Sequence, residues 1–425
     1  MRVNVVNIGC FKNLVDCELL IWQLRNSGVE VSFGQTDIYA DIVIINTCGF
    51  ISDAEKDSLA EINKYVKLKH QGVISQIWVM GCYGEKMKTA LIKNIPDVDR
   101  VYGNFNWHDI IRDISRHEWI ESECRIVSTP KHYAYIKISD GCNMPCSYCI
   151  KPILNGALKS RPIEAVVKEC EMLAKSGVKE LQIVSQNTTE YGRDLYGKQK
   201  IAELIERLSD IEGIEWIRLH YAYPVNFPRN LLDVISSRKN VCNYIDMAIQ
   251  HCNEEMLRKM RRTMSKEHLI DLLDEIRSRG ISIRTTVMTG HPGETEEIYQ
   301  ELKDFVMDRR FDRMGVFLYS HEPLSYSGIN YTDEIPESVK RKRALELMAI
   351  QKDIYARHSS EMVGKRIKVI IDGKNLNGDY VGRPENSTPM ADPKIIIKSF
   401  DPLVVGNFYN TIITNSLGKD MEGNI

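Results

Sequence analysis

The first 110 residues alternate short apolar runs with longer amphipathic segments. The apolar runs read "VNVVNI", "DIVIIN" and "QIWVMG", and the segments after them span residues 13–27, 52–69 and 85–94. This alternation is typical of repeated β-α units, which build a parallel sheet with helices on its faces. We therefore predict an α/β domain with a parallel sheet over residues 1–120.

The same rhythm resumes after a polar stretch that has the character of a linker. Between residues 128 and 360, six runs have strand character: "YAYIKI", "KELQIVS", "EWIRLHY", "YIDMAI", "ISIRTTVM" and "RMGVFLYS". Helical segments such as 162–176 and 294–309 separate them, so we predict a partial or complete βα barrel with functional loops at the carboxyl ends of its strands.

The pattern changes once more after a charged helical segment that spans residues 337–358. The runs "RIKVIID", "KIIIKSF" and "FYNTIIT" are short and are separated by Gly, Pro and Asn. Such runs are typical of strands joined by turns. We predict a small all-β barrel over residues 361–425.

Composition is ordinary for a globular protein, with 43% hydrophobic and 27% charged residues and a formal net charge of -2. This balance gives no reason to expect nucleic acid or an anionic membrane as partner. The first residues lack the pattern of a secretory signal, and no apolar stretch approaches the roughly 18 residues that a membrane span requires. We therefore expect a cytoplasmic protein whose eleven cysteines are reduced.

Three of these cysteines, Cys10, Cys48 and Cys82, each lie just past one of the first strand-like runs. The carboxyl ends of parallel strands meet at one edge of a sheet, where ligands bind in open α/β folds. Convergence on a metal is one interpretation, and burial as small apolar side chains is the other. Cys17 and Cys170 follow the spacing of helical core positions, so we assign both to the core.

The loop after the first barrel strand, "SDGCNMPCSYCIKP", holds Cys142, Cys146 and Cys149 without a second pair nearby. Closed zinc sites use four protein ligands. Three thiolates can instead bind three irons of a [4Fe–4S] cube and leave the fourth iron open to a substrate or cofactor. The alternative is a structural metal site with a distant fourth ligand.

Polar residues also follow the later barrel strands, where a pocket would form. Each has an alternative interpretation as an ordinary polar loop residue. The candidates are Gln186, Asn187, Arg218, His220, Gln250 and His251.

The segment "CNMPCSYC" resembles the signature of the radical S-adenosylmethionine (SAM) family. The resemblance implies that SAM chelates the open iron and that Tyr148 lies by its adenine. Among the strand-end residues, we expect Gln186, Asn187, Arg218 and His251 to contact this cofactor. Reductive cleavage of SAM would then give a 5′-deoxyadenosyl radical. The segment "TGHPGET" suits either SAM positioning or the start of a helix.

The whole chain is similar to the methylthiotransferases, which combine such a barrel with an amino-terminal three-cysteine domain and a terminal TRAM-type barrel. The segments "GCFKNLVDCE", "NTCGFI" and "GCYGEK" match that family's cysteine motifs. By this resemblance Cys10, Cys48 and Cys82 hold a second [4Fe–4S] cluster, whose open iron carries the sulfur to be transferred.

Other segments, including "KISDGCN", "SRPIE" and "RLHYAYP", resemble the RimO branch. This branch modifies the β-carbon of an aspartate in a ribosomal protein of the small subunit. The sister branch, MiaB, which modifies adenosine in tRNA, is the alternative. A non-catalytic iron–sulfur or RNA-binding protein is the third reading. The family also implies a flavodoxin- or ferredoxin-type electron donor and a sulfide source.

The terminal barrel bears on the choice of substrate. Residues 361–425 hold eight Lys or Arg and eight Asp or Glu, so their formal charge is zero. A barrel that grips tRNA should be basic, because contacts to phosphate dominate nucleic-acid affinity. We therefore expect tRNA to be an unlikely partner, and we expect a basic ribosomal protein to meet acidic groups of this barrel. The candidates are Asp372, Asp379, Glu385 and Asp392.

Overall fold

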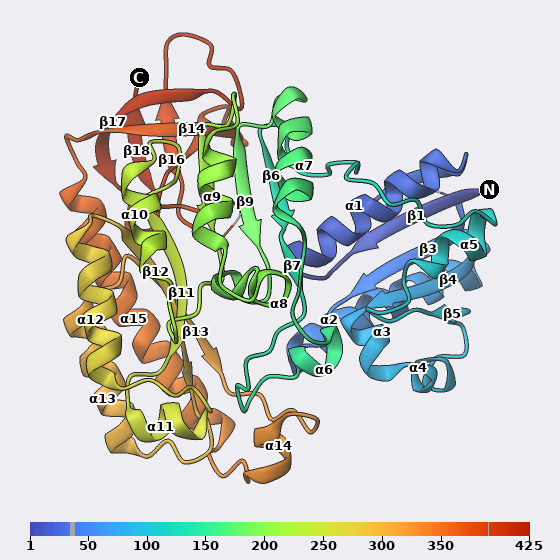
Figure 1. The fold of residues 1–425 in the computed structure, drawn as a ribbon, viewed down its shortest axis with the longest axis horizontal. Coiled ribbons are helices and arrows are strands. Elements are labelled where there is room, and N and C mark those ends of the chain that lie inside the picture. Colours follow the sequence, from blue (N-terminus) through green and yellow to red (C-terminus); the bar gives the residue numbers. More distant parts are fainter. Residues whose placement is uncertain (35–38, 390) are drawn as a thin grey trace.

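A computed structural model describes residues 1–34, 39–389 and 391–425, and it contains three units in chain order (Figure 1). The first is a parallel sheet with helices on both faces, the second an open arc of parallel strands, and the third a closed β-barrel. Among the described residues, no helix combines the length and the apolar character needed to cross a membrane.

The amino-terminal sheet has five parallel strands in the order β2-β1-β3-β4-β5. Their bounds are Arg2–Asn7 (β1), Glu30–Phe33 (β2), Ala40–Thr47 (β3), Ile74–Gly81 (β4) and Arg100–Val101 (β5). The helices are Phe11–Asn26 (α1), Ser52–His70 (α2), Cys82–Met87 (α3), Thr89–Asn94 (α4) and Asp109–Ser115 (α5). Side chains of α1 and α5 cover one face and those of α2 the other.

The predicted parallel α/β architecture is confirmed, and two details differ from the expected pattern. The strands β2 and β5 were not expected, because each offers too few apolar residues to stand out. The helix expected at residues 85–94 is two helices, because Lys88 between them adopts a φ of 45°. A helix cannot continue through a residue in this left-handed region.

The central unit is an arc of six parallel strands. They are Tyr133–Lys137 (β6), Glu180–Val184 (β9), Trp216–Leu219 (β10), Tyr244–Gln250 (β11), Ser282–Thr289 (β12) and Arg313–Leu318 (β13). Two three-stranded sheets, β6-β9-β10 and β11-β12-β13, are joined by parallel bridges from Ile217 to Val241 and from Ala222 to Met247. The barrel is therefore partial, with β6 and β13 at its two ends.

Helices on the outside of the arc bury its apolar surface. The longer ones are Ile163–Lys175 (α7), Ile201–Ser209 (α9), Asn230–Ser237 (α10), Lys266–Ser278 (α12), Glu296–Arg309 (α13) and Glu337–Glu361 (α15). The shorter elements are Ser139–Asp140 (β7), Lys151–Asn155 (α6), Lys159–Ser160 (β8), Thr188–Glu190 (η1), Arg193–Tyr196 (α8), Glu254–Lys259 (α11) and Tyr326–Asn330 (α14). The resulting core includes Cys170 and Cys252, and Cys17 lies in the amino-terminal core. The prediction that Cys17 and Cys170 are core residues is confirmed.

The carboxy-terminal unit is a closed barrel in the order β14-β15-β16-β18-β17. Its strands are Arg366–Lys374 (β14), Tyr380–Pro384 (β15), Ile395–Lys398 (β16), Phe408–Ser416 (β17) and Met421–Asn424 (β18). The predicted barrel is thus present. The strands β15 and β18 were not expected, because each carries a glycine and β15 ends in proline, and both residue types weaken a strand pattern.

This barrel packs against the amino ends of the central strands through a buried ionic cluster. Glu180, at the start of β9, accepts hydrogen bonds from Arg218 at 3.0 Å and from Arg383 at 2.6 Å, and all three side chains are fully buried. Arg383 also pairs with Asp372 at 2.6 Å, and Asp372 contacts His132 at 2.9 Å. Burial alone would raise the pKa of Glu180, but the two arginines outweigh it and hold the pKa below its ordinary value.

Two of the acidic groups expected to meet a ribosomal protein are therefore occupied within the chain. Asp372 belongs to the ionic cluster just described, and Asp392 pairs with Arg284 and accepts hydrogen bonds from Thr388. The expectation that they face a partner is wrong for these two. Their charge is needed to neutralise arginines at the joint between the central and carboxy-terminal units. Asp379 and Glu385 remain partly exposed.

Replacing Glu180 with glutamine should lower the free energy of unfolding by about 3–5 kcal/mol, because buried arginines would lose their shared counter-charge. Urea unfolding followed by tryptophan fluorescence measures this free energy. Trp216 reports on the joint, because its ring centroid lies 4.8 Å from that of Phe408 in the terminal barrel. As control, Lys56→Met removes an exposed pair with Asp53 and should barely shift the midpoint. Equal midpoints for Glu180→Gln and the natural protein would contradict the expected role.

Candidate functional site

The cysteines Cys10, Cys48 and Cys82, the amino-terminal triplet, follow the adjacent strands β1, β3 and β4 at the carboxyl edge of the sheet. The structure brings their thiols together. Burial raises the pKa of the Cys82 thiol to about 11, and the nearby Cys10 and Cys48 thiols add to the rise. Burial likewise raises the pKa of Cys48, and Cys10 contributes. Predicted convergence at this edge is thus what the fold produces.

Local packing fixes where these thiols lie. Gly81 precedes Cys82 with a φ of 90°, and a Cβ there would lie 2.3 Å from the Asn46 side-chain oxygen. Only glycine fits this close approach. Asn104 Nδ2 donates to Cys82 Sγ at 3.4 Å, and the backbone N–H of Cys48 donates to Ser58 Oγ at 3.0 Å.

The cysteines Cys142, Cys146 and Cys149, the barrel triplet, lie in the loop after β6 and β7. Gly141 precedes this loop with a φ of 68°, and a Cβ there would lie 1.9 Å from the Ala157 carbonyl. Ser147, in the middle of the loop, donates its backbone N–H to Met260 O at 2.9 Å and accepts from Ser327 N at 2.7 Å. The loop is therefore held from two later parts of the barrel.

Hydrogen-bond donors surround the sulfur atoms of the barrel triplet. The backbone N–H of Met144 donates to Cys142 Sγ, and that of Lys151 donates to Cys149 Sγ, both at 3.4 Å. The Tyr223 hydroxyl lies 3.5 Å from Cys146 Sγ. Such donors stabilise negative charge on sulfur, and they tune iron–sulfur centres.

Neither triplet has the compact geometry of a site for a single ion. Within the described part of the chain, no three His, Cys, Asp or Glu side chains are close enough together to hold one metal ion. In a [4Fe–4S] cube each thiolate binds a different iron, so the sulfur atoms are spread more widely than around one zinc. Three thiols at each site match the donor set of a cube whose fourth iron is open.

Beside the barrel triplet, several buried polar atoms at the strand ends have no hydrogen-bond partner among the described residues. They are Gln186 Oε1, Asn187 Nδ2 and Gln250 Oε1, whereas His251 Nε2 lies 3.6 Å from the buried Glu294 carboxylate. An unpartnered buried polar atom costs free energy. A polar ligand that carries amino, carboxylate and hydroxyl groups, as SAM does, fits these atoms.

Tyr148 lies in the same region with a partner that sequence reasoning missed. Arg262 donates to the Tyr148 hydroxyl at 3.2 Å, approaches Cys146 Sγ at 3.8 Å and covers the Tyr223 ring at 4.1 Å. No motif in the sequence distinguishes Arg262 from its neighbour Arg261. Its role becomes visible only when the chain is folded.

His291, from the segment "TGHPGET", is also placed under the cysteine loop. Its Nε2 lies 3.1 Å from Ser147 Oγ, and burial lowers the pKa of the ring to about 4. Thr295 caps α13 by accepting from the backbone N–H of Ile298 at 3.3 Å. The segment thus starts a helix and also supports the loop of the barrel triplet.

Arg218 is placed elsewhere. Its fully buried guanidinium pairs with Glu180 and donates to the Glu385 carbonyl, at the amino end of the barrel. The structure does not bring Arg218 to the cysteine loop with Gln186, Asn187 and His251. Its donors bind groups at the joint with the carboxy-terminal barrel instead, so Arg218 is not part of the candidate SAM site.

The two triplets belong to neighbouring walls of one region. Helix α6 starts two residues after Cys149 and packs on α3, where Ile150 and Leu154 share an apolar core with Cys82. Asn104 Nδ2 donates both to Cys82 Sγ and to Asn155 Oδ1, at 3.4 Å and 3.0 Å. Helix α1 also contacts the barrel, where Phe11 stacks on Tyr135 of β6 with ring centroids 4.1 Å apart.

An ionic bridge also joins the domains near this region. Lys86 of α3 pairs with Glu55 of α2 at 2.5 Å and with Glu322, after β13, at 2.6 Å. Ser52 and Ser320 add a hydroxyl contact at 3.0 Å. The amino-terminal domain is therefore tied to both ends of the arc, at β6 and after β13.

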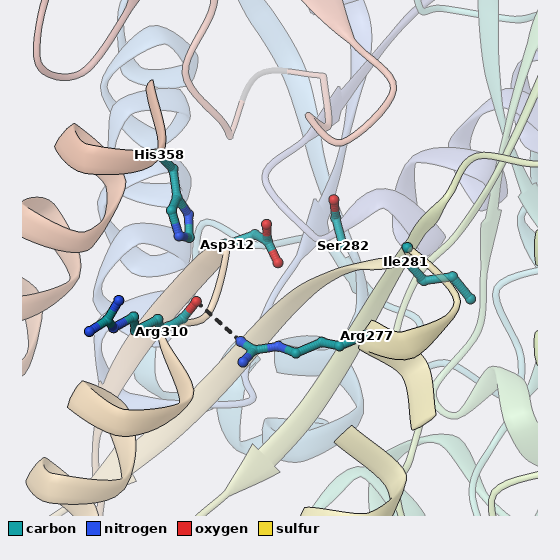
Figure 2. A pocket seen from close by; sticks show the side chains of 7 residues that line it. Arg277, Ile281, Ser282, Arg310, Asp312 and His358 are labelled. Carbon is teal, nitrogen blue, oxygen red and sulfur yellow. Dashed lines mark hydrogen bonds between the residues drawn. The ribbon is translucent and has the colours of Figure 1, made fainter. Parts of the chain in front are cut away.

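A cavity of about 350 Å³ lies at the opposite end of the barrel, at the amino ends of β12 and β13 (Figure 2). Arg277, Ser282, Asp312 and His358 line it, and Arg277 donates to the Arg310 carbonyl at 3.1 Å. None of the cysteines or strand-end residues of the two triplets lines this cavity. We therefore place the candidate site at the carboxyl ends.

Models of three protein families match the chain in succession. The Uncharacterized protein family UPF0004 matches residues 2–103, the Radical SAM superfamily matches residues 136–306, and the TRAM domain matches residues 363–425.

Curated relatives match over the full length. The ribosomal protein uS12 methylthiotransferase RimO of Porphyromonas gingivalis is 47% identical, with 100% of this chain and 99% of that protein covered. The proteins of the same name from Bacteroides fragilis and Cytophaga hutchinsonii are 46% and 40% identical, with 100% of this chain and 99% and 98% of those proteins covered.

Solved structures with a similar fold include the radical SAM methyltransferase TsrM of Kitasatospora setae, with a TM-score of 0.60, 17% identity and 77% of each chain covered. The cobalamin-dependent radical SAM enzyme OxsB has a TM-score of 0.53, 14% identity, and coverage of 77% of this chain and 54% of that one. At such identities the likeness concerns the fold alone.

A partial βα barrel with a three-cysteine loop after its first strand, matched by the superfamily model, defines a radical SAM enzyme. The amino-terminal sheet and the terminal TRAM barrel accompany it in one chain. With 40–47% identity over its full length, the chain belongs to the RimO family of methylthiotransferases.

Proposed function

We propose that this chain inserts a methylthio group at the β-carbon of an aspartate in ribosomal protein uS12. Full-length identity to the RimO proteins supports the reaction and the substrate. The observation that carries the proposal is the approach of two three-cysteine sites, one from the amino-terminal sheet and one from the barrel, through the contact of α6 with α3.

We propose that Cys142, Cys146 and Cys149 hold one [4Fe–4S] cluster and that SAM binds beside it. When bound, the cluster and SAM supply a 5′-deoxyadenosyl radical that removes hydrogen from a carbon. Gln186 and Asn187 offer polar atoms without partners that would orient SAM, and His251 follows β11 with its Nε2 3.6 Å from Glu294. Tyr148 offers an aromatic face, and Arg262 holds its hydroxyl.

We propose that Cys10, Cys48 and Cys82 hold the second [4Fe–4S] cluster. Their thiols are brought together at the sheet edge, and Asn104 donates to one of the sulfur atoms. Three ligands would leave an open iron, as at the barrel triplet, and an open position suits a centre that takes part in the reaction. Each triplet would thus leave one iron of its cluster without a protein ligand.

Further requirements follow from the reaction. A flavodoxin- or ferredoxin-type protein would deliver the electron, and a separate source would supply sulfide. The substrate belongs to the ribosome, so we propose that the protein acts in the cytoplasm. The carboxy-terminal unit, with zero formal charge, lacks the excess of basic residues that a tRNA-gripping barrel should have, which favours a protein substrate over tRNA.

Incubation of the reconstituted enzyme with SAM, a reductant and sulfide should add one methylthio group to uS12 and none to tRNA. Peptide mass spectrometry of uS12 and nucleoside mass spectrometry of tRNA measure both products. A uS12 variant with alanine in place of the modified aspartate serves as control and should stay unmodified. Methylthio-adenosine in tRNA together with unmodified uS12 would reverse the assignment.

A further inference from the structure

Two lysines lie in the region that the triplets share. Lys12 follows Cys10 by two residues at the start of α1, and Lys151 follows Cys149 by two residues at the start of α6. The Lys12 side chain is buried, with 7% of the residue exposed. Its ammonium lies 3.5 Å from the Ser185 carbonyl and 5.6 Å from the centre of the Tyr221 ring. The Lys151 ammonium lies 4.5 Å from the centre of the Phe50 ring.

Each lysine crosses from the domain of one triplet to the domain of the other. Lys12, in the amino-terminal domain, reaches Ser185 and Tyr221, which follow the barrel strands β9 and β10. Lys151, in the barrel, covers the ring of Phe50, which shares an apolar cluster with Cys82. The two ammonium groups also lie close enough to interact electrostatically. Their positive charge therefore lies in the region between the triplets.

This charge has no carboxylate partner of its own. Asp16 and Asp140 lie close enough to Lys12 to interact electrostatically. Both are already paired with Lys137, which lies 3.0 Å from Asp140 and also contacts Asp16. Across residues 1–34, 39–389 and 391–425, neither Lys12 nor Lys151 has a carboxylate within ion-pair distance. A buried charge without such a partner is costly unless a ligand supplies one.

We propose that Lys12 and Lys151 together bind the carboxylate of the aspartate that the enzyme modifies. The inference rests on the proposed function, because the reacting β-carbon of an aspartate is bonded directly to its carboxylate carbon. A β-carbon placed between the two triplets carries its carboxylate into the same region. Each ammonium has three N–H donors, and Lys12 uses one on Ser185.

The thiolates and their clusters are the other anions near these lysines. Their charge is spread over irons and sulfurs, whereas a carboxylate oxygen accepts short, charge-assisted hydrogen bonds. Lys12 and Lys151 would also favour an aspartate substrate over an adenine base. An adenine base is neutral and would offer the two ammonium groups no carboxylate, so it would form none of these charge-assisted hydrogen bonds.

Binding of uS12 by the anaerobically reconstituted, SAM-bound enzyme tests this assignment. The natural uS12 is compared with a variant that has asparagine in place of the modified aspartate. With the natural enzyme, we expect the asparagine variant of uS12 to bind about ten-fold or more weakly than natural uS12. In the enzyme variants Lys12→Met and Lys151→Met, the preference for natural uS12 over its asparagine variant should shrink to about two-fold or less. The reason is that each variant has less positive charge to bind the carboxylate.

Lys168→Met, at an exposed position of α7, is the matched control and should keep the full preference. Iron content is measured for every variant. The assignment is overturned if both lysine variants keep the preference, if they weaken both forms of uS12 equally, or if both lose iron. A natural enzyme that leaves uS12 unmodified would refute the proposed function instead, which separates the two failures.

Discussion

Replacing Cys146 with alanine should abolish the reductive cleavage of SAM. Cys146 is one of three thiols in a loop that is held by Met260 and Ser327, and its sulfur is contacted by Tyr223 and Arg262. Loss of one ligand leaves the cluster that donates the electron with two thiolates. The release of 5′-deoxyadenosine after reduction with dithionite is the measurement, and Cys142→Ala and Cys149→Ala should behave alike.

Iron content should fall by about half in the same variants, because the amino-terminal triplet lies on a separate sheet and keeps its own cluster. Cys124→Ala is a suitable control. It removes a partly buried thiol from the segment between the two units, outside both triplets. It should retain SAM cleavage and full iron content. Release of 5′-deoxyadenosine by Cys146→Ala at the natural rate would show that the barrel triplet does not generate the radical.

Replacing Cys48 with alanine should have a different profile. Methylthio transfer to uS12 should disappear while SAM cleavage persists, because the sulfur-carrying site is lost and the barrel triplet is intact. Liquid chromatography with mass spectrometry quantifies 5′-deoxyadenosine and modified uS12 in one reaction. Their ratio separates loss of sulfur transfer from general inactivation.

Cys17→Ala is the matched control for Cys48→Ala. Cys17 lies in the same domain and is fully buried in the core, where Asn46 donates to its sulfur at 3.2 Å, but it belongs to neither triplet. It should lower stability modestly and keep the ratio of products. If Cys48→Ala formed modified uS12 at the natural rate, the amino-terminal thiols would be core residues and nothing more.

The parts of the fold predicted best from the sequence are those with long, regular patterns. The runs that became β1, β3, β4 and the six barrel strands are strongly apolar, and parallel strands place their carboxyl ends at a common edge. That single rule placed Cys10, Cys48 and Cys82 together. Short strands such as β2 and β18 carry too little pattern, and only their neighbours in the sheet define them.

The site residues were harder to predict from the sequence than the strands and helices. Arg218 and His251 both follow the pattern of polar residues near strand ends, yet Arg218 lies in the joint with the terminal barrel, whereas His251 lies near His291, which contacts the cysteine loop. Position within a strand decides this: Arg218 pairs in register with Gln182, before the carboxyl end is reached. Lys12 and Lys151 can be recognised in the sequence, because each follows a cysteine of a triplet by two residues.

The joint at Glu180 has a consequence for how such chains can vary by recombination. Its charges come from two units, with Glu180 and Arg218 in the central barrel and Arg383 and Asp372 in the terminal one. A recombination event could join this central unit to a terminal barrel that has no arginine at position 383. The buried Glu180 carboxylate would then lose one of its two arginine partners. We therefore expect an exchanged terminal barrel to need a compensating change at the same joint.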